Sequence, residues 1–322
     1  MGKNLSLNKA KDVKNDEFYT QIADIERELK YYKKHFKGAV VFCNCDDPEW
    51  SNFWRYFHLN FEFLGLKKLI STHYDVNVPT YKMEYEGGND ADTTVGTITP
   101  LKQNGDFRSP ECIELLQEAD IVVTNPPFSI AREHYIPILM EYNKKFVVIG
   151  DLNWITYSDF FQYLKENVLW LGYNPVKEFR QPDGTMKKFG NKLWFTNLDI
   201  QKRHESIDLI EKYTPEKYPK YDNYDAIEVK KVLDIPEDYD GVMGVPITFM
   251  SYYNPDQFEI LGKRGDLEWA ENECDFYCPP SEELQKLYKS MDKTWRVQNT
   301  YLLENGVPHT TYGRIFIRRK KG

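Results

Sequence analysis

Asp120-Ile-Val-Val-Thr-Asn-Pro-Pro-Phe128 is the stretch that decides the fold of this 322-residue chain. Ile121–Thr124 is a short apolar run rich in β-branched residues, which predicts a buried parallel strand. Pro126 and Pro127 then fix φ and remove two N–H donors, so neither a strand nor a helix can continue through them. Ligands of open α/β sheets bind at the carboxyl ends of strands, so the loop Asn125–Phe128 is predicted to lie at a ligand site.

The loop also has a distinctive chemistry. It offers the Asn125 side-chain amide and the Pro126 carbonyl as hydrogen-bond acceptors, with the ring of Phe128 beside them. An exocyclic amine could donate to both acceptors while its ring stacks on Phe128. The alternative is a proline turn that only closes a strand. The aromatic residue and the apolar strand before it favour the ligand site.

Further strands and helices alternate along the first two thirds of the chain. Apolar runs predict strands at 38–43, 68–72, 145–150 and 191–197, and amphipathic patterns predict helices at 50–64, 109–118 and 130–142. Residues 81–107 are rich in Gly, Asp and Thr, with Asn104-Gly105 expected as a turn, which fits a hairpin or an excursion from the sheet. This alternation predicts an α/β fold with a doubly wound, mostly parallel sheet.

The amino-acid composition of the sequence changes near residue 205. Tyr, Pro and Asp dominate 213–240, and the later strands are short and interrupted. We therefore predict a flexible arm at 1–16, a first domain at 17–205 and a second region at 206–322. The terminal strand at 314–318 could belong to that region or return to the core.

Composition and cysteine spacing exclude several classes of protein. No apolar run is long enough to span a membrane, and the N-terminus lacks the apolar segment of a signal peptide, so a cytoplasmic protein is expected. The five cysteines are an odd number, which argues against a disulfide framework. Cys43-x-Cys45 and Cys274-x-x-x-Cys278 lack zinc-knuckle spacing, so no metal is predicted.

Charge is unevenly distributed. The net charge of −8 counts against a protein that coats nucleic acid indiscriminately. Basic residues nevertheless cluster, and they predict a basic cleft on an acidic body: Arg180, Lys187, Lys188, Lys192, Lys202, Arg203, Arg314, Arg318, Arg319, Lys320 and Lys321. The alternative is a solvated charged surface with no partner.

Asn125-Pro-Pro-Phe128 resembles the catalytic motif of S-adenosylmethionine-dependent methyltransferases that methylate amino groups. Phe at the fourth position is similar to the adenine-N6 branch, whereas the cytosine-N4 branch usually begins with Ser. Cytosine-C5 enzymes use a Pro-Cys nucleophile, which this stretch lacks. Glutamine methyltransferases of release factors carry Asn-Pro-Pro, usually followed by Tyr. The resemblance implies methylation of an amine or amide nitrogen, with a nucleobase favoured.

A methyl donor of this kind needs contacts for its amino-acid end, its ribose and its adenine. Asn44, Asp46 and Asp47 follow the first strand and are expected to hold the ammonium and ribose hydroxyls. Asp106 and Phe107 are expected at the adenine. The alternative for the two neighbouring aspartates is an N-cap of the helix near Trp50. Gly-x-Gly is absent here, which disfavours a pyrophosphate cofactor.

Several motifs in order resemble the EcoRI-type adenine-specific DNA methyltransferase family. They span roughly residues 16–321 and comprise Phe18-Tyr19-Thr20, Cys43-Asn-x-Asp-Asp-Pro-x-x-Ser-Asn-Phe53, Asn104-Gly-Asp-Phe107, Asn125–Phe128, Gly190-Asn-x-x-Trp-Phe-Thr-Asn197, Phe258-Glu-Ile-Leu-Gly262 and the basic strand at 314–321. The resemblance implies a Rossmann-like methyltransferase fold, with Phe18, Tyr19 and Thr20 at the cofactor and target recognition in 206–322.

The resemblance implies a sequence-specific DNA adenine-N6 methyltransferase with double-stranded DNA as its partner, and a cognate restriction endonuclease as a further candidate partner. The adenine must leave the duplex and stack on Phe128. Trp194 or Phe195 could hold its other face, or both could be core residues of an alternating strand. Lys187, Lys188, Lys192 and Arg314 are expected to contact DNA. RNA or protein-glutamine methylation, and a non-catalytic DNA-binding module, are the alternatives.

Overall fold

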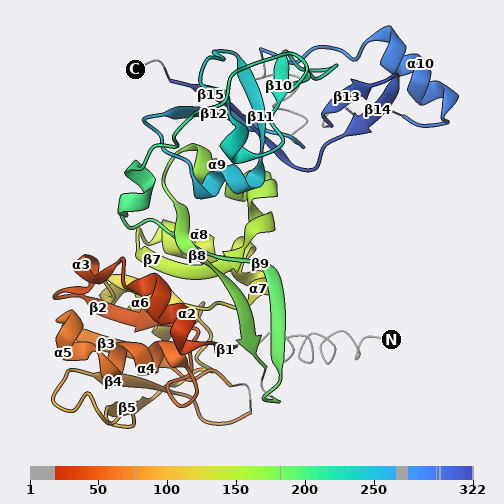
Figure 1. Ribbon diagram of the computed structural model, residues 1–322. Helices are drawn as coiled ribbons and strands as arrows, with labels where there is room; N and C mark the ends of the chain where they lie inside the picture. The colour runs from red at the N-terminus through yellow and green to blue at the C-terminus, as the bar shows by residue number, and fades with distance from the viewer. Residues whose placement is uncertain are drawn as a thin grey trace, which may run out of the picture. The chain divides into compact units, whose positions relative to one another are not determined.

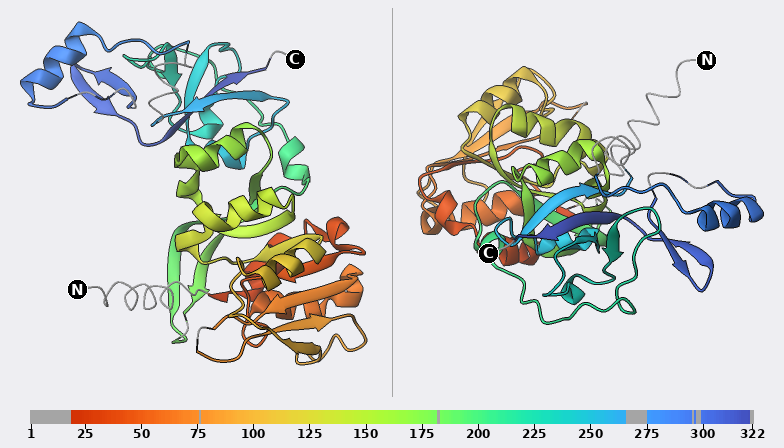
Figure 2. Two further views of the ribbon diagram at one scale, coloured as in Figure 1. Left: turned by 180° about the vertical axis from the view of Figure 1, so that it is seen from behind. Right: turned by 90° about the horizontal axis from the view of Figure 1, so that it is seen from above.

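The computed structural model describes residues 19–75, 77–181, 183–265, 275–294, 296 and 299–320. The predicted arm at 1–16, and with it Phe18, Cys274 and Lys321, lies outside these ranges. The chain forms two compact units, shown in Figures 1 and 2. The first runs to Trp154 and includes Leu171–Ile200, and the second comprises Ile155–Trp170 and the chain from Gln201 onward.

The first unit is built on a mixed sheet. In the described chain it has nine strands in the order β1-β8-β9-β7-β6-β2-β3-β4-β5. Their bounds are β1 Tyr19–Thr20, β2 Val40–Cys43, β3 Lys68–Thr72, β4 Tyr81–Tyr85, β5 Thr97–Pro100, β6 Ile121–Thr124, β7 Lys145–Asp151, β8 Trp170–Arg180 and β9 Met186–Thr196. The central strands β7, β6, β2 and β3 are parallel, as predicted. Antiparallel pairs flank them, including the hairpin β4–β5, whose connection lies between Tyr85 and Thr97 and not at the expected turn Asn104-Gly105.

The order of the central strands creates a switch point. The chain passes from β2 to β3 on one side and later returns to β6 on the other side of β2. All four residues of β2 and all four of β6 are buried, as expected for parallel strands covered on both faces. In sheets of this kind the crevice beyond the carboxyl ends of the two strands at the reversal is the usual ligand site.

The helices of the first unit include the one predicted at 109–118, and helical turns cover most of 130–142. They are α2 Ile22–Leu29, α3 Lys33–Phe36, α4 Asn52–Leu59, α5 Phe61–Leu64, α6 Pro110–Glu118, α7 Phe128–Ile130 and α8 Ile136–Glu141, with a π-helical turn at Ala131–Tyr135 and a 3-10 turn that begins at Leu152. Ser109 caps α6 through a bond from Cys112 N at 3.3 Å, as its sequence predicted. The helix predicted at 50–64 divides at Asn60 into α4 and α5, and α5 ends at Gly65 in the left-handed conformation.

The second unit has its own sheet and aromatic core. The strands β10 Ala226–Glu228, β11 Val242–Pro246, β15 Arg314–Arg319 and β12 Phe258–Lys263 are hydrogen-bonded in that order, so the terminal strand pairs with β11 and β12. The unit also contains the hairpin of β13 Tyr301–Glu304 and β14 Val307–Thr310, the helices α9 Ser158–Lys165 and α10 Glu282–Ser290, and 3-10 turns at Gln201–His204, Val232–Asp234 and Ile247–Ser251. Its core includes Tyr221, Tyr224 and Phe316. Of the helices described in the structure, none is both long and apolar enough to cross a membrane.

Candidate active site

Asp46 joins the two strand ends at the switch point. It follows β2, and its carboxylate accepts hydrogen bonds from the backbone N–H of Asn125 at 3.2 Å and from the Thr124 hydroxyl, both at the end of β6. The Ser51 hydroxyl donates to the other carboxylate oxygen at 2.7 Å. Cys45 N donates to Thr124 Oγ1 at 3.1 Å. The position of the Asn125 loop therefore depends on a carboxylate from the neighbouring strand.

The electrostatics of Asp46 are unusual. Burial raises the pKa of its carboxyl to about 6, against the hydrogen bonds from Thr124, Ser51 and Asn125, which lower it. The nearby charge of Asp47 adds to the rise. Asp46 is thus mostly ionised at neutral pH but titrates close to it. A perturbed carboxyl group at a strand end marks a candidate functional site.

Asp47 connects the end of β2 to the loop after β3. One of its carboxylate oxygens lies 2.5 Å from His73 Nδ1, and the other accepts from Glu49 N at 2.9 Å. The cap of α4 is Ser51, whose hydroxyl accepts from Phe53 N at 3.0 Å. The alternative role of the two aspartates as the N-cap of this helix is therefore not what the structure shows.

Asn44 lies at the same sheet edge, directly after β2. Its side chain is 3% exposed, and its oxygen accepts from Cys45 Sγ at 3.4 Å. Its backbone carbonyl accepts from the Thr72 hydroxyl at the end of β3. Asn44 therefore helps to hold the ends of two parallel strands together.

The loop Asn104–Phe107 packs on the segment that follows β3. Gly105 has a φ of +74°, and a Cβ there would lie 2.3 Å from the carbonyl oxygen of His73, so only glycine permits this approach. Asp106 accepts from Arg108 Nε at 2.9 Å and from a terminal guanidinium nitrogen at 2.6 Å. Burial raises the pKa of Asp106, but the bonds and charge of Arg108 outweigh it, and the pKa is lowered. Phe107 is buried, edge-to-face with Tyr135 at 5.0 Å.

Phe128 begins α7 and belongs to a cluster of aromatic rings. Its ring lies 5.7 Å from that of Phe179 on β8 and 6.2 Å from that of Phe189 on β9, both nearly perpendicular. The ammonium of Lys192 lies 3.9 Å from the centre of the Phe128 ring. Thr20 pairs with Phe179 across the β1–β8 ladder, so the described part of the Phe-Tyr-Thr stretch lies one strand away from this cluster.

Trp194 and Phe195, predicted either to hold one face of a base or to be core residues, are both buried. Trp194 and Phe195 are 1% and 0% exposed, and they pack against Phe53 and Trp154 respectively. The core interpretation of these two residues fits the structure. The ring that contacts Phe128 from β9 is Phe189, which no motif of the sequence indicated. In the sequence, Phe189 could have been noticed only as an aromatic residue directly before Gly190, at the start of a predicted motif.

The predicted DNA-contacting cations fall into two groups. Lys188 is 81% exposed, with its ammonium 3.2 Å from Glu178, and Lys187 is also exposed. Lys192 is instead only 5% exposed and ion-paired with Asp151, so it is a buried residue rather than part of a solvent-facing cleft.

Arg314 of the second unit, whose side chain is 13% exposed, is likewise held in an ion pair. Its guanidinium pairs with Glu228, whose side chain is 1% exposed, and the Tyr221 hydroxyl donates to the same carboxylate. Burial alone would lower the pKa of Arg314, but Glu228 raises it above its ordinary value. The guanidinium of Arg314 is thus engaged by a buried carboxylate.

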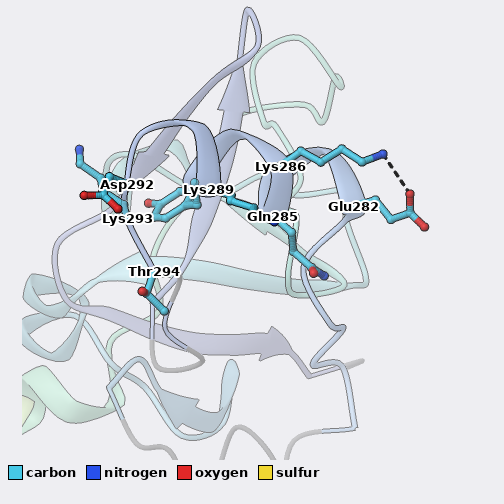
Figure 3. Close-up of a pocket in the computed structure, with 8 residues that line it drawn as sticks. Glu282, Gln285, Lys286, Lys289, Asp292, Lys293 and Thr294 are labelled. Atoms are coloured by element: carbon cyan, nitrogen blue, oxygen red, sulfur yellow. Dashed lines mark hydrogen bonds and ion pairs between the residues drawn. The ribbon is translucent and has the colours of Figure 1, made fainter.

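A separate hollow lies on α10 of the second unit (Figure 3). It has a volume of about 670 Å³ and is lined by Glu282, Gln285, Lys286, Tyr288, Lys289, Asp292, Lys293 and Thr294. The Lys286 ammonium lies 3.2 Å from a Glu282 oxygen, as the dashed line in Figure 3 shows. Within the described ranges, His, Cys, Asp and Glu side chains form no group of three or more that could hold a metal ion.

Comparisons with known proteins cover almost the whole chain. The model of a family described as "Adenine-specific methyltransferase EcoRI" matches residues 6–320. Type II methyltransferase M.EcoRI of Escherichia coli is 45% identical over 308 residues, which is 86% of this chain and 94% of that protein. Type II methyltransferase M.MgeORF184P of Mycoplasma genitalium is 40% identical over 276 residues, 79% of this chain and 85% of that protein. Type II methyltransferase M.MpnI of Mycoplasma pneumoniae is 39% identical over the same length, with 84% of that protein covered. No solved structure matches.

Proposed function

This chain belongs to the EcoRI family of adenine-specific methyltransferases and is a sequence-specific DNA adenine methyltransferase, and we propose that the sheet edge where β2, β3 and β6 end is its active site. The observation that carries the proposal is the bond from Asn125 N to the Asp46 carboxylate. It fixes the Asn-Pro-Pro-Phe loop at the reversal of strand order, the place where sheets of this type bind ligands.

S-adenosylmethionine is the cofactor we propose for this edge, because the polar side chains there match the hydrogen-bonding groups of the molecule. The molecule presents an ammonium, ribose hydroxyls and an adenine amine, all of which donate hydrogen bonds. The edge presents acceptors, namely Asn44, Asp46, Asp47 and Asp106, with Phe107 beside them. Tyr19 and Thr20, with Phe18 before them, are proposed to complete the cofactor site. When bound, S-adenosylmethionine supplies an electrophilic methyl group.

Asn125 and Pro126 are proposed to act on the adenine amine. That nitrogen is a weak nucleophile because its lone pair is conjugated into the ring. The Asn125 side-chain oxygen and the Pro126 carbonyl would each accept one amine hydrogen, which favours a tetrahedral nitrogen and frees the lone pair. Acceptors held rigidly in place stabilise the transition state more than the ground state. Pro127 stiffens the loop because its φ is fixed.

Phe128 is proposed to stack on the adenine once the base has left the duplex, because the amine is inaccessible inside it. Asp46 acts one step further back, by holding the backbone of Asn125. Since Trp194 and Phe195 are core residues, we assign neither of them to the base. Orientation of the amine by these fixed groups supplies much of the rate enhancement.

Recognition of the target sequence is proposed for residues 206–322, with catalysis in 17–205. In the second unit, α10 and the turn after it carry exposed Lys286, Lys289 and Lys293. Lys187 and Lys188 of β9 are proposed to contact backbone phosphates, which fix the register of a protein on DNA without reading its sequence. A restriction endonuclease of the same specificity is the protein partner we would look for.

The test is long-read sequencing of DNA from cells that express the chain. We expect N6-methyladenine at one sequence motif for the wild type and for Asn89→Ala, a matched control because Asn89 is exposed and its bonds in the loop are made by its backbone. Asn125→Ala should lower the rate by about 100-fold or more, as for loss of one fixed polar contact to a transition state. DNA without N6-methyladenine, or an Asn125→Ala variant as fast as the wild type, would contradict the assignment.

A further inference from the structure

We infer that Lys192 is a positioning residue that fixes the ring of Phe128 for the extruded adenine. The inference rests on the proposed function, since it takes Phe128 as the stacking residue. From the sequence, Lys192 is expected to contact DNA. A phosphate contact would require an exposed ammonium, so the role inferred for this buried lysine is a different one.

The side chain of Lys192 is held from several directions. It is 5% exposed, and its ammonium lies 2.9 Å from an Asp151 carboxylate oxygen. Lys192 and Asp151 face each other in the β7–β9 ladder, so the backbone fixes both ends of the ion pair. The side-chain amide of Asn191 donates to both Asp151 oxygens at 2.9 Å. Asp151 is therefore itself fixed in orientation.

The same ammonium lies on the ring of Phe128. It is 3.9 Å from the ring centre, within the range of a strong cation–π contact, and 5.2 Å from the ring centre of Phe189. Phe179 and Phe189 meet the Phe128 ring nearly perpendicularly, at 82° and 71°. The ring is thus held by a cation and two further rings. Its orientation is set before any substrate arrives.

Burial of the Lys192 ammonium needs a reason, because a charge loses hydration when it is taken out of water; the side chain of Lys192 is 5% exposed and that of its partner Asp151 20%. An apolar side chain of similar volume would fill the same space with equal or greater stability. What an apolar residue could not supply is attraction to the face of the ring. A cation on one face draws π-electron density toward itself, so the opposite face repels the electron-rich purine less when it stacks. Lys192 thereby orients Phe128 and improves it as a stacking surface.

The experiment compares Lys192→Met, which keeps the length and loses the charge, with Lys192→Arg, which keeps the charge. Lys177→Met is the control, because Lys177 is an exposed lysine on β8 outside the proposed site. The probe is a duplex carrying 2-aminopurine at the target adenine of the motif found by sequencing, since its fluorescence rises when the base leaves the stack. Lys192→Met should weaken the equilibrium for base extrusion, and lower kcat, by about 2- to 30-fold. Lys192→Arg should recover most of this loss, and Lys177→Met should match the wild type.

A double variant separates this role from a structural one. Lys192→Met with Asp151→Asn removes both charges, leaves no carboxylate without its cation, and should stay folded. If the melting temperature of the double variant equals that of the wild type and its 2-aminopurine signal is still weakened, the inference stands. If folded Lys192→Met, or the folded double variant, extrudes the base within about twofold of the wild type, the inference is wrong. Failure of the proposed function looks different, because then the wild type itself methylates no adenine.

Discussion

Replacement of Asp46 by asparagine should change how the stability of the protein depends on pH. The carboxylate accepts from Ser51, Thr124 and the backbone of Asn125, yet burial raises its pKa from an ordinary 3.8 to about 6. An introduced amide can keep the main contacts, with its oxygen toward Thr124 and Asn125 and its NH₂ toward the Ser51 hydroxyl. The variant therefore removes the titration of Asp46 while it preserves the geometry.

The size of the effect follows from linkage between protonation and folding. Because the pKa is higher in the folded protein, the folded state binds the proton more tightly, and the resulting stabilisation is complete only below about pH 4. It is lost as the pH rises through about 6. With folded and unfolded values of about 6 and 3.8, the full span is about 3 kcal/mol, of which about 1.4 kcal/mol is lost between pH 5 and pH 8. The stability of Asp46→Asn relative to the wild type should rise by that amount over the same interval.

The assay is urea unfolding of both proteins at pH 5, 6, 7 and 8, followed by the fluorescence of the buried Trp54 and Trp194 of the first unit. Comparison at each pH cancels the titration of all other groups. Asp106→Asn gives a control without pH dependence in this range, since Arg108 lowers the pKa of Asp106 below its ordinary 3.8. The contribution of Asp106 to stability is therefore complete at pH 5, and the difference between Asp106→Asn and the wild type should stay constant from pH 5 to pH 8. If the free energies of unfolding of Asp46→Asn and the wild type change in parallel with pH, the raised pKa of Asp46 is refuted.

Local signals predicted the centre of the fold correctly. The run Ile121–Thr124 coincides with β6, and the cap at Ser109 with the start of α6. Both depend on a few adjacent residues whose propensities agree, which is why they can be read without tertiary information. The break of the 50–64 helix at Asn60 could not be read this way, because the amphipathic pattern continues across it.

Burial of charged residues was the part that the sequence could not supply. Lys192 lies in the same basic stretch as Lys187 and Lys188, but only the ladder between β7 and β9 shows that it faces Asp151. Similarly, Arg314 meets Glu228, which is far away in the sequence. A run of positive charge indicates total charge and not which ammonium groups reach solvent. The same limit hid Phe189, because the sheet decides which ring of an aromatic-rich strand meets Phe128.

Three further variants test the remaining assignments. Asp106→Ala should weaken S-adenosylmethionine binding by calorimetry in a protein that stays folded, although loss of the Arg108 contacts lowers its melting temperature; unchanged binding in the folded variant would instead show a purely structural role. Arg314→Met should cost about 3–5 kcal/mol in urea unfolding, because it leaves Glu228 buried without its cationic partner, and an unaffected midpoint would contradict this. Replacement of Lys187 and Lys188 by Gln should make the affinity for a DNA duplex less dependent on salt. The affinity would be measured by fluorescence anisotropy at salt concentrations from about 50 to 200 mM. Each phosphate contact contributes about −0.9 to the log–log slope because it releases condensed counterions, so loss of both contacts should reduce the slope by about 2. Preference for the target sequence should not change, since phosphate contacts carry no base information. If the slope stays the same, these two lysines do not contact DNA, and the basic surface must be sought on α10.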